Sequence, residues 1–594
     1  CKMWRWTLLL VAACGVDAFV SIGGGLGGRA PALGAAQRGS VLSCSRGKGR
    51  LSSLAMQDQT RPKVAVVGAG WGGWAAAKAL CENGCDVTLL DTLKDPTGAE
   101  PMLTPTGKPF EPGTRGFWMD YPNIEALLAQ RNVNIKEVLS DFEASSFFSP
   151  SGLEATAPVF SSSLFPQLPS PIGQVFATFS NFKRLPVQDR LTMVGLLYAM
   201  LDFTRDEATF EAYDRMTAHE LFLRMGLSKR LVDDFIRPTL LVGLFKPPEE
   251  LSAAVAMELL YFYALAHQDS FDVRWVKKQS IQETMIHPLA THLQDTFSLD
   301  VKAGCAVKQL VLSEDASRVT SIQYVDTANG WNSEIKTLEV DACVLALGAK
   351  GMKAVVAGSP AVAKHVPELS RAASLGGVDV VAARIWLDRY VEVEHPANVL
   401  SNFPALRGSG GTFFMLDQLQ PDQVALWGGL EPQGSVLSCD FYNAGAIQTL
   451  SDEAIIDLLM KELLPAAVPA FRSAVVVDSF VQRFPGAVTW FSPGSYANRP
   501  PLQTKLKNLV CAGDWVRMGD REHGAKGLCQ ERAYVSGLEA ANALARNGML
   551  KKLTRQHPVI PIRDDEPQVV LGRQVNGEVM KFLTPLGLSS PWVR

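Results

Sequence analysis

The segment Arg61–Asp91 constrains the fold most, because it has the pattern of a strand, a tight turn, a helix and a second strand. Lys63–Val67 is a short valine-rich run, and three glycines follow it at the spacing G-x-G-x-x-G: Gly68, Gly70 and Gly73. In such a motif the first glycine permits the turn, the second lets a pyrophosphate approach the backbone, and the third lets the helix pack closely on the strand. The pattern predicts an α/β fold with a Rossmann-like domain and a dinucleotide site.

The second half of this segment supplies an acidic residue. The helix expected over 74–82 ends at Asn83-Gly84, and the strand expected over 86–90 ends at Asp91. Asp91 lies at the distance from the glycines at which a carboxylate accepts hydrogen bonds from a ribose. The start of the helix offers free N–H groups and a positive dipole end to phosphates. A tight strand-to-helix turn without a ligand is the alternative.

Composition excludes several other classes of protein. The chain has 594 residues, of which 47% are hydrophobic and 20% charged, so it can form a large core in two intertwined domains. The net charge is −3 and no basic patch is present, so we expect no nucleic acid partner. The ten cysteines and eight histidines are dispersed, and we therefore expect neither a metal site nor a disulfide framework.

Residues 1–57 have the pattern of a targeting leader. Lys2 and Arg5 flank the apolar run Trp6–Cys14, and small residues follow, as in a signal peptide. Residues 20–57 contain no Asp or Glu but five Lys or Arg, as in a transit peptide. The two in tandem resemble the bipartite leader of a protein sent to a secondary plastid. A plain secretory signal with a linker is the alternative.

The middle of the chain alternates between irregular, helical and strand patterns. Residues 147–180 are rich in Ser, Pro and Phe and are expected to form an irregular lid, whereas 187–267 has helical periodicity. Ser252–His267 is apolar on almost every side, which indicates either core burial or the lining of an apolar cavity. Further on, 301–312 alternates as one strand, and 320–326 and 337–340 are expected to form a hairpin.

A second pattern of a strand, an acidic residue and a helix lies near the C-terminus. The buried strand expected over Leu509–Ala512 is followed by Gly513 and Asp514, and a helix is expected over Gly527–Arg546. The tail beyond Gly548 is polar, and it carries no motif.

Three stretches together resemble one known family, the FAD-dependent amine-oxidase-like flavoproteins. They are the glycine motif with Asp91, the segment FEPGTRGFWMDYPNIEALL at 110–128, and LVCAGDW…YVSGLEAAN between 509 and 542. Within that family the sequence is most similar to the phytoene and ζ-carotene desaturases of plant and cyanobacterial type. Residues 216–260 resemble the helical substrate domain of those enzymes.

The resemblance implies FAD as the cofactor and assigns residues to it. Gly68, Gly70 and Gly73 would hold the pyrophosphate, and Asp91 the adenosine ribose. The backbone of Val307 would meet the adenine. The remaining cofactor-binding residues are implied at the C-terminal motif: Gly513, Asp514, which would bind the ribitol, and Glu531. The helix that starts there would direct its positive end at the flavin, where negative charge develops on reduction.

The resemblance also implies a division of the chain. A GR2-type FAD-binding domain would be discontinuous, over 58–145, 286–357 and 501–550. A helical substrate or lid region would occupy 146–285, an α+β substrate domain 358–500, and a tail 551–594. The sequence departs from the family at four places: Asp91 stands for the usual Glu, Lys94–Gly98 for Gly-Gly-Arg or Gly-Gly-Lys, Glu283-Thr284 for Glu-Arg, and Arg532 for Gly.

The implied function is an oxidoreductase that desaturates or isomerises a lipophilic, carotenoid-like polyene by hydride transfer to flavin, with a quinone as the expected electron acceptor. No catalytic base is identified; His523 and Lys526 are polar candidates near Gly513, and the alternative is that they are ordinary surface residues. We expect peripheral attachment to a plastid membrane through the apolar stretch 165–182. Two alternatives remain open: an amine oxidase of the same fold, and a non-catalytic flavin- or pigment-binding plastid protein.

Overall fold

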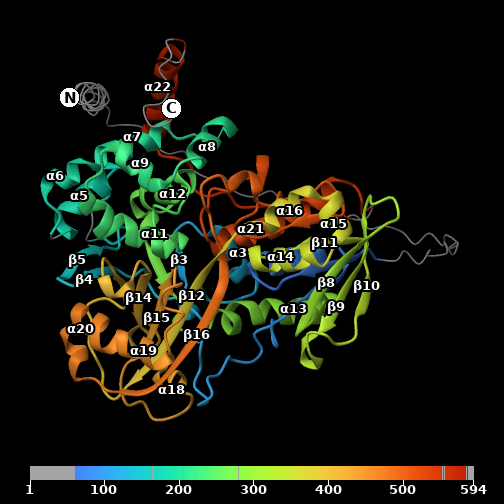
Figure 1. Ribbon diagram of the computed structural model, residues 1–594, viewed down its shortest axis with the longest axis horizontal. Helices are drawn as coiled ribbons and strands as arrows, with labels where there is room; N and C mark the ends of the chain where they lie inside the picture. The colour runs from blue at the N-terminus through green and yellow to red at the C-terminus, as the bar shows by residue number, and fades with distance from the viewer. Residues whose placement is uncertain are drawn as a thin grey trace, which may run out of the picture. The chain divides into compact units, whose positions relative to one another are not determined.

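A five-stranded parallel sheet carries the glycine motif in the computed structural model (Figure 1). The structure describes residues 61–163, 166–182, 184–204, 206–278, 280–550, 553, 555–583 and 585, so the predicted leader lies outside the described residues. The strand order is β17-β11-β1-β2-β7, and every neighbouring pair is parallel. The strands are β1 (Lys63–Val67), β2 (Asp86–Leu90), β7 (Asp300–Lys302), β11 (Ala342–Leu345) and β17 (Leu509–Cys511). The predicted Rossmann-like α/β fold, assembled from distant segments, is confirmed.

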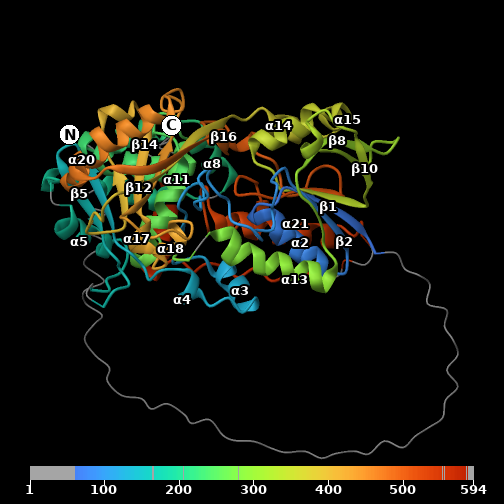
Figure 2. The same ribbon diagram turned by 90° about the horizontal axis from the view of Figure 1, so that it is seen from below.

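Layers cover this sheet on both sides (Figure 2). One side carries α2 (Trp71–Glu82), α13 (His287–Phe297) and α21 (Gln530–Arg546), next to α3 (Pro122–Gln130). The other side carries the antiparallel sheet β8 (Cys305–Leu312), β9 (Val319–Asp326) and β10 (Lys336–Glu339) with α14 (Ala349–Ala357), α15 (Pro360–His365) and α16 (Pro367–Ala373). The hairpin expected over 320–340 is therefore present.

A mixed seven-stranded sheet forms the second domain, in the order β16-β12-β15-β14-β13-β4-β5. Its strands are β4 (Ser145–Ser149), β5 (Gly152–Ala157), β12 (Gly377–Leu387), β13 (Ala397–Leu400), β14 (Gly410–Met415), β15 (Val436–Tyr442) and β16 (Val476–Thr489). One face packs against α19 (Asp452–Asp457), the π-helix Leu458–Leu463 and α20 (Leu464–Ala467) in an apolar core. Smaller elements complete this part: α4 (Ile135–Val138), α17 (Leu416–Leu419), α18 (Gln423–Leu426) and the ribbon β3 (Gly116–Trp118) with β6 (Val273–Trp275).

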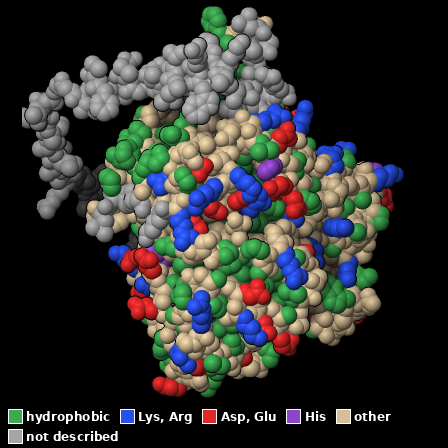
Figure 3. Space-filling model, turned by 60° about the vertical axis from the view of Figure 1, so that its left-hand side comes forward, with side chains coloured by type: hydrophobic (Ala, Val, Ile, Leu, Met, Phe, Trp, Pro, Cys, Tyr) green, Lys and Arg blue, Asp and Glu red, His purple; other side chains and the backbone are tan. Residues whose placement is uncertain are grey.

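Helices fill the region between β5 and β6. They are α5 (Ile172–Asn181), α6 (Val187–Leu191), α7 (Met193–Asp202), α8 (Glu207–Asp214), α9 (Ala218–Met225), α10 (Lys229–Leu231), α11 (Arg237–Leu244) and α12 (Ala253–Leu260). The apolar helix α12 lies in the main core, which supports core burial for it. Figure 3 brings the α5 and α6 side forward and shows hydrophobic side chains gathered at its upper left.

Two expectations from the sequence are wrong, and one helix was not predicted. Residues 147–180 are no irregular lid, because they contain most of β4, all of β5 and most of α5; β4 pairs in parallel with β13, about 250 residues further along the chain. The run 301–312 is two strands, since Gly304, at φ +61°, turns the chain between β7 and β8. The tail, for which no element was predicted, contains a helix, α22 (Pro567–Leu583), which packs against α7.

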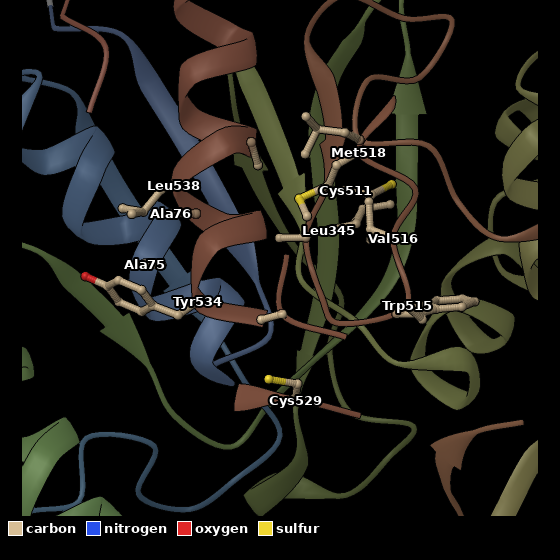
Figure 4. Packing of buried hydrophobic residues seen from close by; sticks show 14 of the residues in the cluster. Ala75, Ala76, Leu345, Cys511, Trp515, Val516, Met518, Cys529, Tyr534 and Leu538 are labelled. Carbon is tan, nitrogen blue, oxygen red and sulfur yellow. The ribbon is translucent and has the colours of Figure 1, made fainter. Parts of the chain in front are cut away.

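Glycines allow α2 and α21 to cross in close contact. A Cβ on Gly537 would lie 2.1 Å from the carbonyl oxygen of Gly72, and one on Gly73 would lie 1.8 Å from that of Gly68. Figure 4 shows Ala75 and Ala76 of α2 facing Leu538 and Tyr534 of α21 in this contact. Helices α2 and α21, which are far apart in the sequence, are thereby held side by side against one sheet.

Candidate functional site

The glycine loop lies at the carboxyl end of β1, where open α/β sheets bind their ligands. The N–H of Gly68 donates to the carbonyl of Leu90 over 2.8 Å, and Gly68 has φ +105°. A Cβ there would lie 2.2 Å from the oxygen of Ala346, so only glycine fits. Gly70 differs from its neighbours, because it is exposed and a Cβ on it would meet nothing within 4 Å. The space that faces Gly70 is therefore open for a ligand.

Helix α2 begins directly after this loop and has no side-chain cap. Its first N–H groups therefore lack the partner that a Ser, Thr or Asp would supply. The same is true of α14 after Gly348 and of α21 after Cys529. Three uncapped helix starts of this kind follow strands of the parallel sheet, and each offers N–H groups to an anion.

Asp91 is joined to the glycine loop by hydrogen bonds. Its Oδ2 accepts from the N–H of Ala69 over 2.7 Å, and its Oδ1 accepts from that of Leu93 over 2.8 Å. Each oxygen keeps a further lone pair that a ribose hydroxyl can use. The carbonyl of Asp91 accepts from Cys305 over 2.7 Å, which places β8 and its half-buried Val307 beside this acid.

Gly513 and Asp514 approach the same loop from the other side. A Cβ on Gly72 would lie 3.2 Å from the nitrogen of Gly513, whose N–H donates to Ser536 Oγ over 2.7 Å. Burial raises the pKa of Asp514 to about 6, although the positive charge of Arg532 opposes the shift. The two acids that lie far apart in the sequence, Asp91 and Asp514, therefore flank a single glycine loop.

The carboxylate of Glu531 faces α3. Its Oε1 accepts from the backbone and side-chain nitrogens of Asn123, over 2.9 and 2.6 Å, and its Oε2 accepts from the N–H of Ile124 over 3.0 Å. Glu531 thus caps the start of α3, and burial raises its pKa to about 7. Its predicted role toward FAD stays a prediction.

Arg532, which replaces the usual glycine, is buried beside Asp514. Its Nε donates to the carbonyl of Asp514 over 2.6 Å, its Nη2 donates to that of Val516 over 2.8 Å, and its Nη1 pairs with Glu522. Lys526 is bonded to the same Glu522 carboxylate over 2.5 Å. The guanidinium therefore ties the loop that carries Asp514 to α21.

The two polar candidates near Gly513 are both held inside the protein. His523 accepts from the N–H of Ala525 over 3.2 Å and contacts the carbonyl of Ile560 over 3.1 Å, and burial lowers its pKa to about 4. Lys526 is 1% exposed and pairs with Glu522 and Glu258. These contacts give both residues a structural role.

A buried polar cluster on the seven-stranded sheet was not found from the sequence. Asp440 on β15 and Gln482 on β16 both lie opposite Ala382 on β12, and Arg384 follows on the same face. Buried side-chain atoms of all three polar residues lack hydrogen-bond partners: Asp440 Oδ1, Gln482 Oε1 and Arg384 Nε. Such orphaned atoms cost about 1–3 kcal/mol each.

The segment 110–118 connects this polar cluster to the start of α21, near the glycine loop. Asp440 Oδ2 accepts from the N–H of Thr114 over 3.2 Å, and Arg384 donates to the carbonyl of Glu111 over 3.2 Å. Two residues beyond Thr114, the carbonyl of Gly116 accepts from Gln530, the first residue of α21. Burial raises the pKa of Asp440 to about 6 and lowers that of Arg384 to about 10.

Three aromatic residues, Trp118, Tyr121 and Tyr263, pack against one another near the start of α21. Trp118 lies 4.7 Å from Tyr263 and 6.1 Å from Tyr121, measured between ring centroids. The two tyrosine hydroxyls are 3.4 Å apart, and Cys529 Sγ lies 3.2 Å from that of Tyr121. Because the rings contact one another, they leave no gap for an ammonium group between them.

These observations fit a dinucleotide at the carboxyl edge of the parallel sheet. The open side of Gly70, the uncapped start of α2 and the acid at Asp91 suit a pyrophosphate and its ribose. In the described ranges no three His, Cys, Asp or Glu side chains are placed to hold a metal ion. No helix in the described part of the chain has the length and hydrophobicity that a bilayer span requires.

Comparison with known protein families agrees with this geometry. Residues 72–545 match the family model described as flavin containing amine oxidoreductase. The chain belongs to this family. It is a flavin-dependent oxidoreductase similar to carotene desaturases, as the sequence motifs imply.

Two proteins that are similar to this chain have names that describe action on carotenoids. The 15-cis-phytoene desaturase of Solanum lycopersicum is 25% identical over 499 residues, which cover 82% of this chain and 78% of the relative. The carotenoid phi-ring synthase of Streptomyces griseus is 25% identical over 537 residues, which cover 87% and 93%. Among solved structures, cyclohexylamine oxidase from Brevibacterium oxydans has a TM-score of 0.54 at 14% identity, with coverage of 82% of this chain and 99% of that chain. Putrescine oxidase has a TM-score of 0.55 at 14% identity with the same coverage, and both likenesses show the fold.

Proposed function

We propose that the protein binds FAD and acts on a lipophilic polyene of the carotenoid class, which it either oxidises by desaturation or isomerises without net oxidation. The observation that carries the proposal is the single glycine loop flanked by Asp91 and Asp514, in a chain whose curated relatives are named as carotenoid enzymes. At 25% identity the relatives support the class of substrate and leave the particular bond open.

The residues of the glycine loop would hold the cofactor. Gly68, Gly70 and the start of α2 would bind the pyrophosphate, Asp91 the adenosine ribose, and Asp514 the ribitol. The flavin, when bound, would supply the acceptor for a hydride taken from the substrate. Arg532 and Glu522 fix the loop of Asp514, so they would keep that carboxylate in place.

Asp440 is our candidate for the proton acceptor. Desaturation removes a hydride from one carbon and a proton from its neighbour, and the electron pair of the second C–H bond becomes the new double bond. A polyene has no group that can take the proton, so the protein must provide a base. Asp440 is a buried carboxyl with one unpartnered oxygen and a pKa of about 6, which suits proton transfer near neutral pH.

The test is to load the purified protein with FAD and add cis-phytoene, ζ-carotene or lycopene isomers without oxygen. Loss of the flavin band near about 450 nm with one polyene, and its return on addition of a quinone, would support the proposal. A loaded protein that no polyene bleaches, but that changes the isomer composition of one, would be an isomerase. A loaded protein that neither is bleached by a polyene nor converts one would be a flavin- or pigment-binding protein without turnover. In a separate assay with oxygen, oxidation of amines with release of peroxide would instead identify an amine oxidase, which the packed ring group of Trp118 does not favour.

We also propose that the protein attaches to the surface of a lipid bilayer, from which it takes its substrate. Helix α5 exposes Ile172, Phe176 and Phe179, each at least half exposed and spaced to lie on one face of the helix. This helix contains no charged residue, and the guanidinium of Arg190 lies over the ring of Phe179 at 4.9 Å. An apolar stripe beside a cation suits a membrane with anionic headgroups.

A second apolar stripe lies on α22. Leu571, Val575, Val579 and Phe582 recur at helical spacing, and the face of α22 that packs on α7 does not include them. Both stripes belong to the helical part of the molecule, as do the exposed Val187 and Leu191 of α6. Flotation with vesicles that contain anionic lipid tests this proposal, and a protein that stays in the lower fraction would contradict it.

The proposed location is a plastid, with a quinone as electron acceptor. The plant relatives are named as chloroplastic or chromoplastic proteins. The composition of residues 1–57 supports a signal followed by a transit peptide. Fusion of residues 3–60 to a fluorescent protein, in an alga with a secondary plastid, tests the location.

A further inference from the structure

The start of α21 holds a buried carboxylate without a counter-ion. Glu531 is the second residue of this helix and is 0% exposed. Its oxygens accept three hydrogen bonds, all of them from Asn123 and Ile124 on α3. The neighbouring cation, Arg532, is paired with Glu522, and among the described residues Glu531 forms no ion pair. Because a buried charge is normally paired with an opposite one, this carboxyl can hold either its charge or a proton.

A cavity lies one side chain away from this carboxylate. It has a volume of about 400 Å³ and is enclosed by α2, α3, α13, α21 and the segment 555–560. Its lining includes Asn123, which donates to Glu531, and Tyr534, which follows Glu531 by one turn of α21. Figure 4 shows Cys529 just before α21 and Tyr534 in its first turns. A space of this size admits water, so Glu531 can exchange a proton with solvent without a large movement of the chain.

Two opposing effects act on the charge of Glu531. The starts of α3 and α21 meet at this carboxyl, and their dipoles favour the charged form, whereas burial favours the neutral form. Burial prevails and raises the pKa of Glu531 from 4.5 to about 7. Burial also keeps Cys529 and Tyr534 protonated and His523 neutral. Glu531 can therefore change its charge near neutral pH. The titratable groups around Glu531 and Asn123 are Glu125 on α3, which pairs with Arg274, Cys529 and Tyr534 at the start of α21, His523 in the loop before it, and the pair Lys78–Glu82 across the cavity.

We propose that Glu531 is a redox-linked proton acceptor, which takes up one proton when the flavin is reduced and returns it when the flavin is reoxidised. The assignment rests on the proposed function, in which the start of α21 faces the flavin. Transfer of a hydride adds two electrons and one proton, so the cofactor site gains one negative charge. A second negative charge on a buried carboxylate close by is unfavourable, and Glu531 removes it by taking a proton from solvent.

The proton on Glu531 then serves the expected electron acceptor. Reduction of a quinone to a quinol requires two electrons and two protons. Two electrons and one proton come from the reduced cofactor, and the second proton comes from Glu531, which becomes a carboxylate again. The total charge is the same before and after this step. The proton that Asp440 takes from the substrate is separate and returns to solvent.

The test counts the protons taken up when bound flavin is reduced without substrate. The midpoint potential of the FAD-loaded protein is measured against pH by spectroelectrochemistry, and its slope gives the number of protons for every two electrons. Above about pH 7, where Glu531 is ionised in the oxidised protein, wild type should take up as much as about one proton more than Glu531→Gln. Below about pH 6, where Glu531 is already protonated, the two slopes should be equal.

A matched variant and a second measurement complete the test. Glu539→Gln removes another buried acid from α21, one that pairs with Arg546, and it should take up protons as wild type does. Reduction of the flavin in wild type at about pH 8 should also produce the infrared band of a protonated carboxyl, and this measurement needs no variant.

The outcomes distinguish this assignment from the proposed function. Equal slopes for wild type and Glu531→Gln above about pH 7 overturn it, as does the absence of the infrared band or an equal loss in Glu539→Gln. In each of these cases the protein still binds flavin, so the proposed function stands. A protein that binds no flavin overturns both.

Discussion

Asp440→Asn should make the protein more stable at alkaline pH. Asp440 is 1% exposed, and burial raises the pKa of its carboxyl from 3.8 to about 6 despite the nearby Arg384. This difference corresponds to about 3 kcal/mol that the ionised form costs on folding. The amide of asparagine is isosteric and bears no charge, and its oxygen can accept from Thr114 as the carboxylate does.

The sign of the pH dependence follows from linkage. A carboxyl whose pKa is raised in the folded state contributes its stability below the unfolded value of 3.8, and this contribution is lost as the pH rises through about 6. Wild type and Asp440→Asn should therefore unfold alike near pH 4. At pH 8 the variant should be more stable, by as much as about 3 kcal/mol.

The assay is urea unfolding of wild type and Asp440→Asn at pH 4.5 and pH 8. The quantity compared at each pH is the difference between their unfolding midpoints. Asp478→Asn on β16 is the control, because its effect should be the same at pH 4.5 and pH 8. Burial alone would raise the pKa of Asp478, but its bonds from Lys108 and Thr106 lower it. That variant should lose stability equally at both pH values, and it should approach wild type only below pH 3.8, as the pH falls through the lowered pKa.

A difference between Asp440→Asn and wild type that is flat with pH, or that favours wild type at pH 8, would refute the reasoning. Either result would mean that Asp440 is ionised and stabilised by Arg384, as a structural ion pair. Loss of polyene turnover in a variant that is more stable would show that the protein keeps a costly carboxyl for its chemistry.

Three further predictions concern the cofactor edge and the surface. Gly70→Ala should keep the thermal midpoint, because the new methyl group meets no protein atom, but it should lower the flavin content at least tenfold, because the methyl group occupies the space proposed for the pyrophosphate. Gly73→Ala should lower the midpoint itself, because its methyl group would collide with the carbonyl of Gly68. Gly537→Val should separate α2 from α21 and lower both the midpoint and the flavin content, as measured by scanning fluorimetry and absorbance. Phe176→Glu should weaken vesicle flotation, and Trp331→Glu, at the same 61% exposure on a distant loop, should not; equal flotation of the two variants would contradict the assignment to α5.

Local motifs made the cofactor half of the molecule predictable. The glycine spacing and Asp91 lie within one strand–helix–strand unit, so short-range pattern alone identifies them. Gly513 and Asp514 needed the resemblance to a family, because nothing local links them to residue 68. The contact between Gly72 and Gly537 cannot be read from either helix, since it depends on how the two cross.

Pairings over long distances account for the errors. The strand at 145–149 is rich in Ser and Phe, and it is a strand because β13 offers it a parallel edge about 250 residues later. Its local composition is that of a loop, so no pattern within the segment could reveal the partner. Helix α22 was missed for a similar reason: its packed face is narrow and is set by Asn576, which bonds Tyr198 on α7.

The polar cluster on β12, β15 and β16 could not be predicted from the alternation of polar and apolar residues along a strand. Arg384 alternates with apolar neighbours, and a strand with that pattern is expected to turn its polar side to water. Here both faces are covered, because α19 and α20 take the apolar face and the segment 110–115 lies over the polar one. Alternation with a period of two shows which residues share a face of the sheet, but it does not show whether that face is exposed to solvent. A buried face that retains Arg384, Asp440 and Gln482 with unpartnered atoms costs stability, so it is the part of the second domain where selection for chemistry is the simplest explanation.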